Sequence, residues 1–181
     1  MNFDLYFKKA LTYEKYVYQL GENQNLHNRH YERFKITADR QKAIKKITPL
    51  NILVLTEPWC GDSLAIFPVV RKLAETNGCW LIKVLRRDEN TEFMDHFLTR
   101  GGRAIPIFLF LSEDFKLIFR WGPRPYAAQQ IFETYRQQIQ DGEIEKSTVI
   151  KKIRMFYSRD RGQEIMKELL STMKEHIILY S

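Results

Sequence analysis

Apolar residues recur along the chain with two different periods, and the change of period separates predicted helices from predicted strands. Residues 3–20 carry apolar side chains mostly three and four positions apart, which predicts an amphipathic helix, and residues 38–47 predict a second one. From residue 51 onward, short continuous apolar runs bounded by turn residues are typical of buried strands. We expect such strands at 51–57, 79–86, 105–111 and 116–121.

Helices are predicted between and after these strands, at 63–76, 90–102, 127–140 and 147–178, the last with a possible break at 158–162. This order predicts an α/β fold of the βαβαββα type, with a central mixed sheet of about four strands flanked by helices. Strands that alternate with helices are expected to be parallel, and the last two strands are expected to form an antiparallel hairpin. The expected segments are a helical extension at 1–48 packed on the core, a domain at 49–142 and a helical extension at 143–181.

Composition narrows the class of protein. The 181 residues, 44% of them hydrophobic, suffice for one core of ordinary domain size. No apolar stretch approaches the ~18 residues that span a bilayer, and the first residues lack the order of a secretory signal, so we expect a cytoplasmic protein. The net charge of +7 favours a solvated basic surface over a nucleic-acid site, because no nucleic-acid motif accompanies it. His27 and His30 are expected on the surface, and neither a metal site nor a cofactor is predicted.

The candidate chemistry centres on Cys60, one of two cysteines. Cys60 follows a predicted strand and opens a predicted helix, where unpaired N–H groups and the helix dipole favour a thiolate. The charge of Asp62 opposes this effect, so the sequence does not fix the pKa of Cys60. Ser63 lies one helical turn onward; its hydroxyl can donate to the sulfur but cannot form a disulfide.

The second cysteine is a poor partner for Cys60. Cys79 is predicted to be a small buried hydrophobe entering a strand, and the intervening helix would hold it roughly 20 Å from Cys60, whereas disulfide-bonded Cα atoms lie within about 7 Å. Any disulfide of Cys60 would therefore be a mixed one, with a protein or with a low-molecular-weight thiol.

A proline converges on the same place. Ile105 and Pro106 stand at the entrance of a predicted central strand, where a proline is tolerated only as the first residue and often has a special geometry. The predicted turn at residues 58–61 that carries Cys60, which we call the cysteine turn, lies one βαβα unit earlier. With both features, the chain resembles the thioredoxin superfamily, and more narrowly bacterial thioredoxin-family proteins with a Trp-Cys-Gly-Asp turn. The resemblance spans about residues 51–140 and rests on "NILVLTE", "WCGDS", the "IP" pair and the "WG" at 121–122.

The resemblance implies a set of roles for the site. It implies a cis peptide at Ile105–Pro106 that faces Cys60, with the backbone of Ile105 pairing with an extended substrate. Nucleophilic Cys60 would act with Ser63, and the substrate would contact Trp59, Gly61, Asp62, Ile105, Pro106 and Gly122. Trp59 would wall the site, and Gly122 would leave room for the bound chain.

Two departures from the pattern change the expected mechanism. Ser63 replaces the resolving cysteine, and the apolar Val54 stands where the family has a buried acid; the N-terminal helices also replace the usual first strand. The leading hypothesis is monothiol thiol-disulfide exchange through Cys60, in cell redox homeostasis. The alternatives are a redox-inactive binding module for a protein partner and, because "CGDS" resembles Cys-Gly-Phe-Ser, a monothiol glutaredoxin-like carrier of glutathione or an iron–sulfur cluster. Arg103 is a candidate for holding a glutathione carboxylate.

Overall fold

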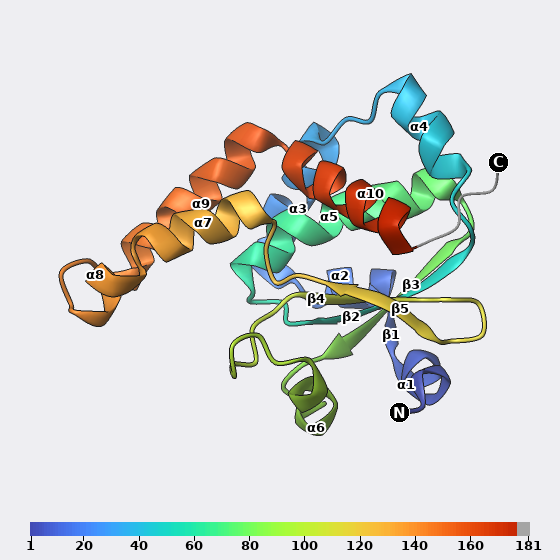
Figure 1. Cartoon of the computed structure of the whole chain (residues 1–181), viewed down its shortest axis with the longest axis horizontal. Coiled ribbons are helices and arrows are strands. Elements are labelled where there is room, and N and C mark those ends of the chain that lie inside the picture. The colour runs from blue at the N-terminus through green and yellow to red at the C-terminus, as the bar shows by residue number, and fades with distance from the viewer. Residues whose placement is uncertain (177–181) are drawn as a thin grey trace.

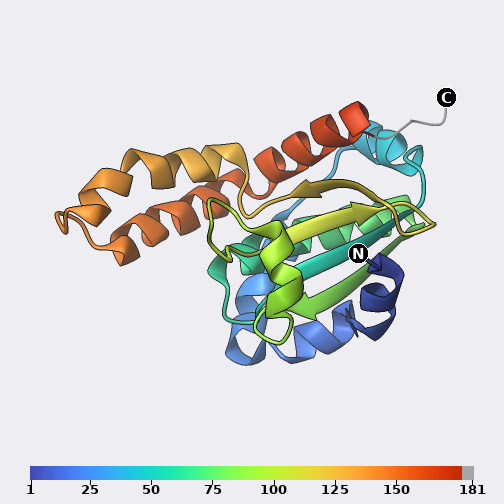
Figure 2. The same ribbon diagram turned by 60° about the horizontal axis from the view of Figure 1, so that its bottom comes forward.

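A five-stranded sheet lies between helices in the computed structural model, which describes residues 1–176 (Figures 1 and 2). The strands are β1 (Leu11–Thr12), β2 (Leu50–Thr56), β3 (Trp80–Arg86), β4 (Ile107–Leu111) and β5 (Leu117–Trp121), in the order β1-β3-β2-β4-β5. The predicted α/β class, mixed sheet and antiparallel β4–β5 hairpin are confirmed. The sheet has one strand more than expected, at the β1 edge.

The direction of β4 differs from the prediction. β2 and β3 are parallel as expected, but β4 runs antiparallel to β2. The register explains the difference, because Ile107 at the start of β4 pairs with Leu55 near the end of β2. The connection from β3 therefore stays at one end of the sheet instead of crossing back over it, and β4 starts where β2 ends.

The helices fall into two layers and a projecting arm. The bounds are α1 (Phe3–Lys9), α2 (Tyr13–Tyr18), α3 (Gln24–Arg33), α4 (Ala38–Lys45), α5 (Gly61–Asn77), α6 (Thr91–Met94), α7 (Tyr126–Thr134), α8 (Arg136–Gln140), α9 (Lys146–Asp160) and α10 (Gln163–His176), with 3-10 turns at Gly21–Asn23 and Asp95–Phe97. Within residues 1–176, no helix has both the length and the apolar character that a membrane crossing requires.

Strand β2 is buried along its whole length because its side chains pack into a hydrophobic core on each face of the sheet. Ile52 and Val54 belong to the larger core, which α5, α9 and α10 also enter. Leu53 and Leu55 point to the smaller core, which α1 and α6 cover. This two-sided burial is why β2 appears in the sequence as a continuous apolar run rather than as an alternating one.

The N-terminal segment is more divided than predicted. The single helix expected at 3–20 is broken, because Leu11 pairs with Val84 of β3 as the short antiparallel strand β1. Thr12 then caps α2 by accepting a hydrogen bond from the N–H of Lys15. The absence of a first strand was thus a wrong prediction, and α3 was not predicted at all.

Two residues differ from their predicted exposure. His27 on α3 is buried, not on the surface; its Nε2 lies 2.6 Å from the Tyr13 hydroxyl, and burial lowers the pKa of His27 to about 4. Cys79 is exposed rather than buried. It precedes β3, in a turn where its N–H donates to the Asn77 side chain, and the first inward residue of the strand is Trp80.

Helices α7, α8 and α9 form an arm that extends from the sheet, whereas α10 returns to lie beside α5 (Figure 1). The helix predicted at 127–140 is interrupted at Tyr135, between α7 and α8. The predicted break at 158–162 is confirmed, since Arg161 and Gly162 adopt left-handed conformations between α9 and α10. The predicted end of the last helix at 178 lies outside the described residues.

Candidate functional site

Cys60 sits at the junction of β2 and α5, where it forms the N-cap of the helix. Only 6% of the residue is exposed, and its sulfur lies 3.4 Å from the carbonyl oxygen of Ile105, to which the thiol donates. The Ile105–Pro106 peptide bond is cis. We call the segment around Ile105 and Pro106 the proline loop. The fold therefore brings Cys60 into direct contact with this loop, although Cys60 and Ile105 are 45 positions apart in sequence.

Burial decides the protonation of this thiol. It raises the pKa of Cys60 above its ordinary value, while the hydroxyl and N–H of Ser63 act in the opposite direction and the negative charge of Asp62 adds to the rise. The helix terminus favours the thiolate, as expected, but desolvation outweighs it. The protonated thiol is the main form at neutral pH, in keeping with its hydrogen bond to Ile105.

Ser63 is fully buried one turn after Cys60, and its hydroxyl forms a short hydrogen bond with the hydroxyl of Thr56. This contact ties the first turn of α5 to the end of β2. Val54 is also fully buried and packs in the larger core. An apolar side chain at that position has no proton to give to Cys60.

Asp62 is held by two residues that sequence reasoning did not identify. Arg124, in the loop after β5, places Nε and Nη2 at 2.8 and 2.7 Å from one carboxylate oxygen, and the Tyr157 hydroxyl of α9 donates to the other at 2.9 Å. We call these three residues the Asp62 clamp. It joins the cysteine turn to the β5–α7 loop and to the arm. Burial keeps the pKa of Tyr157 well above its usual range, so its hydroxyl retains the proton that it donates.

The clamp leads to a prediction about the pH dependence of Cys60. Replacing Asp62 with asparagine is expected to lower the pKa of Cys60, because it removes a negative charge that disfavours the thiolate. The alkylation rate of Cys60 near neutral pH should then rise, since only the thiolate reacts. The measurement is the pH profile of iodoacetamide alkylation in a Cys79→Ala background.

An Asp114→Asn variant is the control, because Asp114 pairs with Lys116 in the β4–β5 turn. Its profile should match that of the parent. An unchanged pKa in Asp62→Asn would mean that Arg124 already cancels the effect of the carboxylate at the sulfur.

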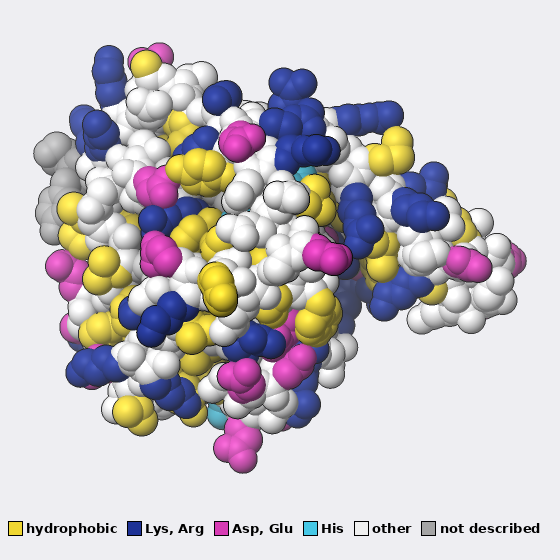
Figure 3. Space-filling view, turned by 180° about the vertical axis from the view of Figure 1, so that it is seen from behind, with side chains coloured by type: hydrophobic (Ala, Val, Ile, Leu, Met, Phe, Trp, Pro, Cys, Tyr) yellow, Lys and Arg dark blue, Asp and Glu magenta, His cyan; other side chains and the backbone are white. Residues whose placement is uncertain are grey.

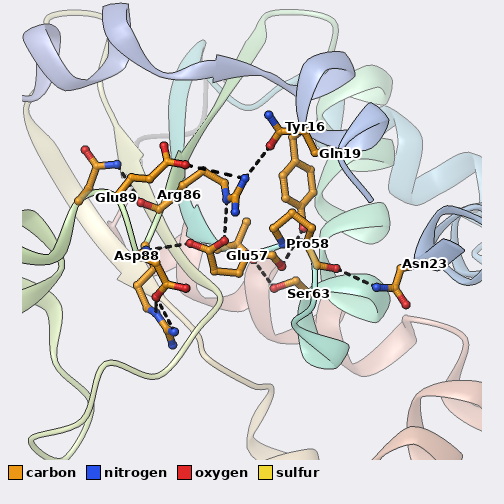
Figure 4. Close-up of polar contacts among 12 residues, drawn as sticks. Tyr16, Gln19, Asn23, Glu57, Pro58, Ser63, Arg86, Asp88 and Glu89 are labelled. Carbon is orange, nitrogen blue, oxygen red and sulfur yellow. Dashed lines mark hydrogen bonds and ion pairs between the residues drawn. The ribbon is translucent and has the colours of Figure 1, made fainter. Parts of the chain in front are cut away.

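A fully buried acid, Glu57, lies three residues before Cys60 (Figure 4). Glu57 is fully buried, with one carboxylate oxygen 2.6 Å from Nε of Arg86 and the other 2.8 Å from the N–H of Asp88. Arg86 also donates to Gln19, the C-cap residue of α2, at 2.9 Å. The Glu57–Arg86 pair therefore joins the end of β2, the end of β3 and the end of α2.

A pocket of about 400 Å³ opens beside Cys60. The exposed Trp59 ring lines it and lies 4.9 Å from the guanidinium carbon of Arg87, which also lines it. Ile105 and Pro123 contribute from the two loops at this end of the sheet, and α9 closes another side. That Trp59 walls a substrate site stays a prediction.

Arg103 does not take the place considered for it. Its guanidinium makes a two-pronged ion pair with Asp95, with both side chains exposed, and the side chain is not part of the pocket lining. The backbone oxygen of Arg103 instead accepts a hydrogen bond from Arg87. Arg87 is therefore the basic residue from this part of the chain that reaches the pocket.

Gly122 has a structural role that the sequence did not reveal. Its φ angle is +113°, and a Cβ atom at this position would lie 2.3 Å from the carbonyl oxygen of Pro106. Only glycine allows the loop after β5 to approach the proline loop this closely. That Gly122 also leaves room for a bound chain stays a prediction.

Comparison with known proteins supports the thioredoxin-like fold. A family model described as "Thioredoxin" matches residues 10–136, which extends the match well before residue 51. No curated protein matches the sequence.

Two solved structures share the fold at low identity. An HIV epitope scaffold is 19% identical and covers 71% of this chain and 81% of its own, with a TM-score of 0.64. A protein of unknown function from Pseudomonas aeruginosa is 18% identical and covers 82% and 92%, also with a TM-score of 0.64. With the family match over more than half of the chain, these likenesses identify the fold, and the protein is a member of the thioredoxin family.

Proposed function

We propose that the protein carries out thiol-disulfide exchange through Cys60 alone. The observation that supports this function best is the position of the sulfur, 3.4 Å from the Ile105 carbonyl beside the cis Ile105–Pro106 bond and in the lining of an open pocket. A disulfide-containing ligand in that pocket could bring one of its sulfur atoms to Cys60 while its other atoms contact Ile105.

The exchange proceeds in two steps, the formation of a mixed disulfide and its resolution. The Cys60 thiolate attacks one sulfur of a disulfide, so a mixed disulfide forms as the original S–S bond breaks, and the released thiolate takes up a proton. An external thiol then attacks the mixed disulfide and restores Cys60. Ser63 favours the thiolate but is buried against Thr56 and supplies no second sulfur.

A binding module without turnover is the competing function, and the burial of Cys60 favours it. A thiol with a raised pKa is mostly protonated at neutral pH, which slows attack on a disulfide. The thiolates that do form are the stronger nucleophiles, because intrinsic nucleophilicity rises with pKa.

The test compares a Cys79→Ala variant with the Cys60→Ser/Cys79→Ala double variant. Removing Cys79 is necessary because it is exposed and would react by itself. After incubation with the neutral bis(hydroxyethyl) disulfide, mass spectrometry should find one thiol adduct on the first variant and none on the second. A reducing thiol should remove the adduct.

The opposite result is an unmodified Cys60 in a folded Cys79→Ala variant after long incubation. In that case the exchange function is wrong, and the cysteine turn is left as part of a binding surface.

A further inference from the structure

We propose that the pocket beside Cys60 binds the anionic part of a low-molecular-weight thiol or disulfide, with Arg154 and Lys146 of α9 as its binding residues. This inference rests on the proposed function of Cys60 and names the class of its substrate. Neither residue belongs to the cysteine turn, the proline loop or the span that the family model matches.

The size and shape of the pocket suit a small molecule. Its volume of about 400 Å³ lies within the usual range of small-ligand sites, about 300–1,000 Å³. Ile150 and Ile153 of α9 and the ring of Trp59 give it apolar walls, and Cys60 and Ile105 lie at one side. A compact ligand could pack its carbon atoms on these walls while its sulfur meets Cys60.

The charges around the pocket favour an anion. Of its basic residues, Arg124 is paired with Asp62 and Arg87 with Asp88. Arg154 and Lys146 make neither an ion pair nor a side-chain hydrogen bond with any residue between 1 and 176. Asp62 is the acidic residue in the lining, and the clamp already neutralises it.

Arg154 lies against Gly61, the residue that follows Cys60. A Cβ atom on Gly61 would be 3.4 Å from Nη2 of Arg154, so the guanidinium covers the residue next to Cys60. Lys and Arg side chains gather where the arm leaves the body of the molecule (Figure 3). Residues of α9 and of the cysteine turn both line the pocket. The guanidinium fork can hold a carboxylate or a phosphate, and either group on a small thiol would satisfy it.

Exchange with such a ligand takes place in two steps. Cys60 loses its proton and attacks one sulfur of the bound disulfide; the new S–S bond forms, the old one breaks, and the departing thiolate takes up a proton. A second molecule of the small thiol then attacks the mixed disulfide, which restores Cys60 and releases a disulfide. The cations of α9 would hold the anionic part of the ligand during both steps.

The experiment measures adduct formation on Cys60 in the Cys79→Ala background with three small disulfides. They are dithiodiglycolate, which is anionic, bis(hydroxyethyl) disulfide, which is neutral, and cystamine, which is cationic. Each rate is divided by the rate of the same disulfide with mercaptoethanol, which removes intrinsic reactivity. We expect the anionic disulfide to be preferred over the neutral one by about tenfold, equivalent to ~1.4 kcal/mol, and the preference to fall as salt is added.

Matched variants test the two residues. Lys146→Gln/Arg154→Gln should abolish the preference, so that the normalised rate of the anionic disulfide falls to that of the neutral one. Lys151→Gln/Arg159→Gln removes the same charge from α9 at positions outside the pocket lining and should keep the preference. Equal rates for the three disulfides, or a preference that survives the first pair of substitutions, would overturn the inference while leaving exchange by Cys60 intact.

If Cys60 reacts with none of the disulfides, the proposed function fails, and the pocket is tested separately. Dithiodiglycolate is then titrated into the Cys60→Ser/Cys79→Ala variant and followed by NMR chemical shifts. Saturable shifts in α9 and the cysteine turn that disappear in the added Lys146→Gln/Arg154→Gln background would support an anion site. Their absence would reject it.

Discussion

Replacing Arg86 with methionine is expected to lower the free energy of unfolding by about 3 kcal/mol, because it leaves the Glu57 carboxylate buried without a cation. The carboxylate is completely buried, and its oxygens are held by Arg86 and by the N–H of Asp88. Removing one partner of such a pair costs more than the pair itself contributes, since the remaining charge cannot regain its hydration. Urea denaturation monitored by circular dichroism measures the change.

The neighbouring arginine supplies a closely matched control. The side chains of Arg86 and Arg87 are 24% and 20% exposed, but their partners differ: Glu57 is 0% exposed and Asp88 is 51% exposed. Arg87→Met should therefore cost no more than about 1 kcal/mol. Adding Glu57→Gln to Arg86→Met should recover part of the loss, because it removes the unpaired charge. Equal losses for Arg86→Met and Arg87→Met would show that Glu57 is hydrated despite its burial.

Replacing Gly122 with alanine is expected to destabilise the fold by about 3 kcal/mol and to slow adduct formation at Cys60. The added Cβ would require an unfavourable φ angle and would lie 2.3 Å from the Pro106 carbonyl oxygen. Backbone atoms cannot rotate aside as a side chain can, so the proline loop must shift. Because Ile105 in that loop contacts the sulfur, the effect should reach the site.

Gly142→Ala separates the two causes. Gly142 has φ +74° but has no atom within 4 Å of its added Cβ, so only the φ penalty applies. Its cost should be about 1 kcal/mol, with adduct formation unchanged. If Gly122→Ala and Gly142→Ala have the same effects in denaturation and in the exchange assay, the contact with Pro106 is not what requires glycine.

Local signals explain what the sequence predicted correctly. The apolar run of β2, the turn at Pro58 and the helix that follows lie within one short stretch, so their pattern reflects the fold directly. The β4–β5 hairpin is also local. The break within residues 3–20 was missed because the helical spacing continues across it, and only pairing with the distant β3 turns Leu11 into a strand residue.

The polar contacts of the site could not be predicted from the sequence for the same reason. Asp62 meets Arg124 and Tyr157 across 62 and 95 positions of sequence, and no spacing rule connects them. Glu57 ends an apolar run, where a charged residue ordinarily marks an exposed strand end, so its burial shows only when Arg86 of β3 lies beside it. A lone acid directly after a mostly apolar strand was the one signal available.

The burial of Cys60 has a consequence for the lifetime of whatever is attached to it. A sulfur that holds its proton tightly is also a slow leaving group, because the thiolate that must depart is destabilised by the same desolvation. Its position under Ile105 further limits direct attack on that sulfur by an incoming thiol. Under the proposed exchange function, a mixed disulfide at Cys60 would therefore be released slowly, and its release would limit the rate of turnover.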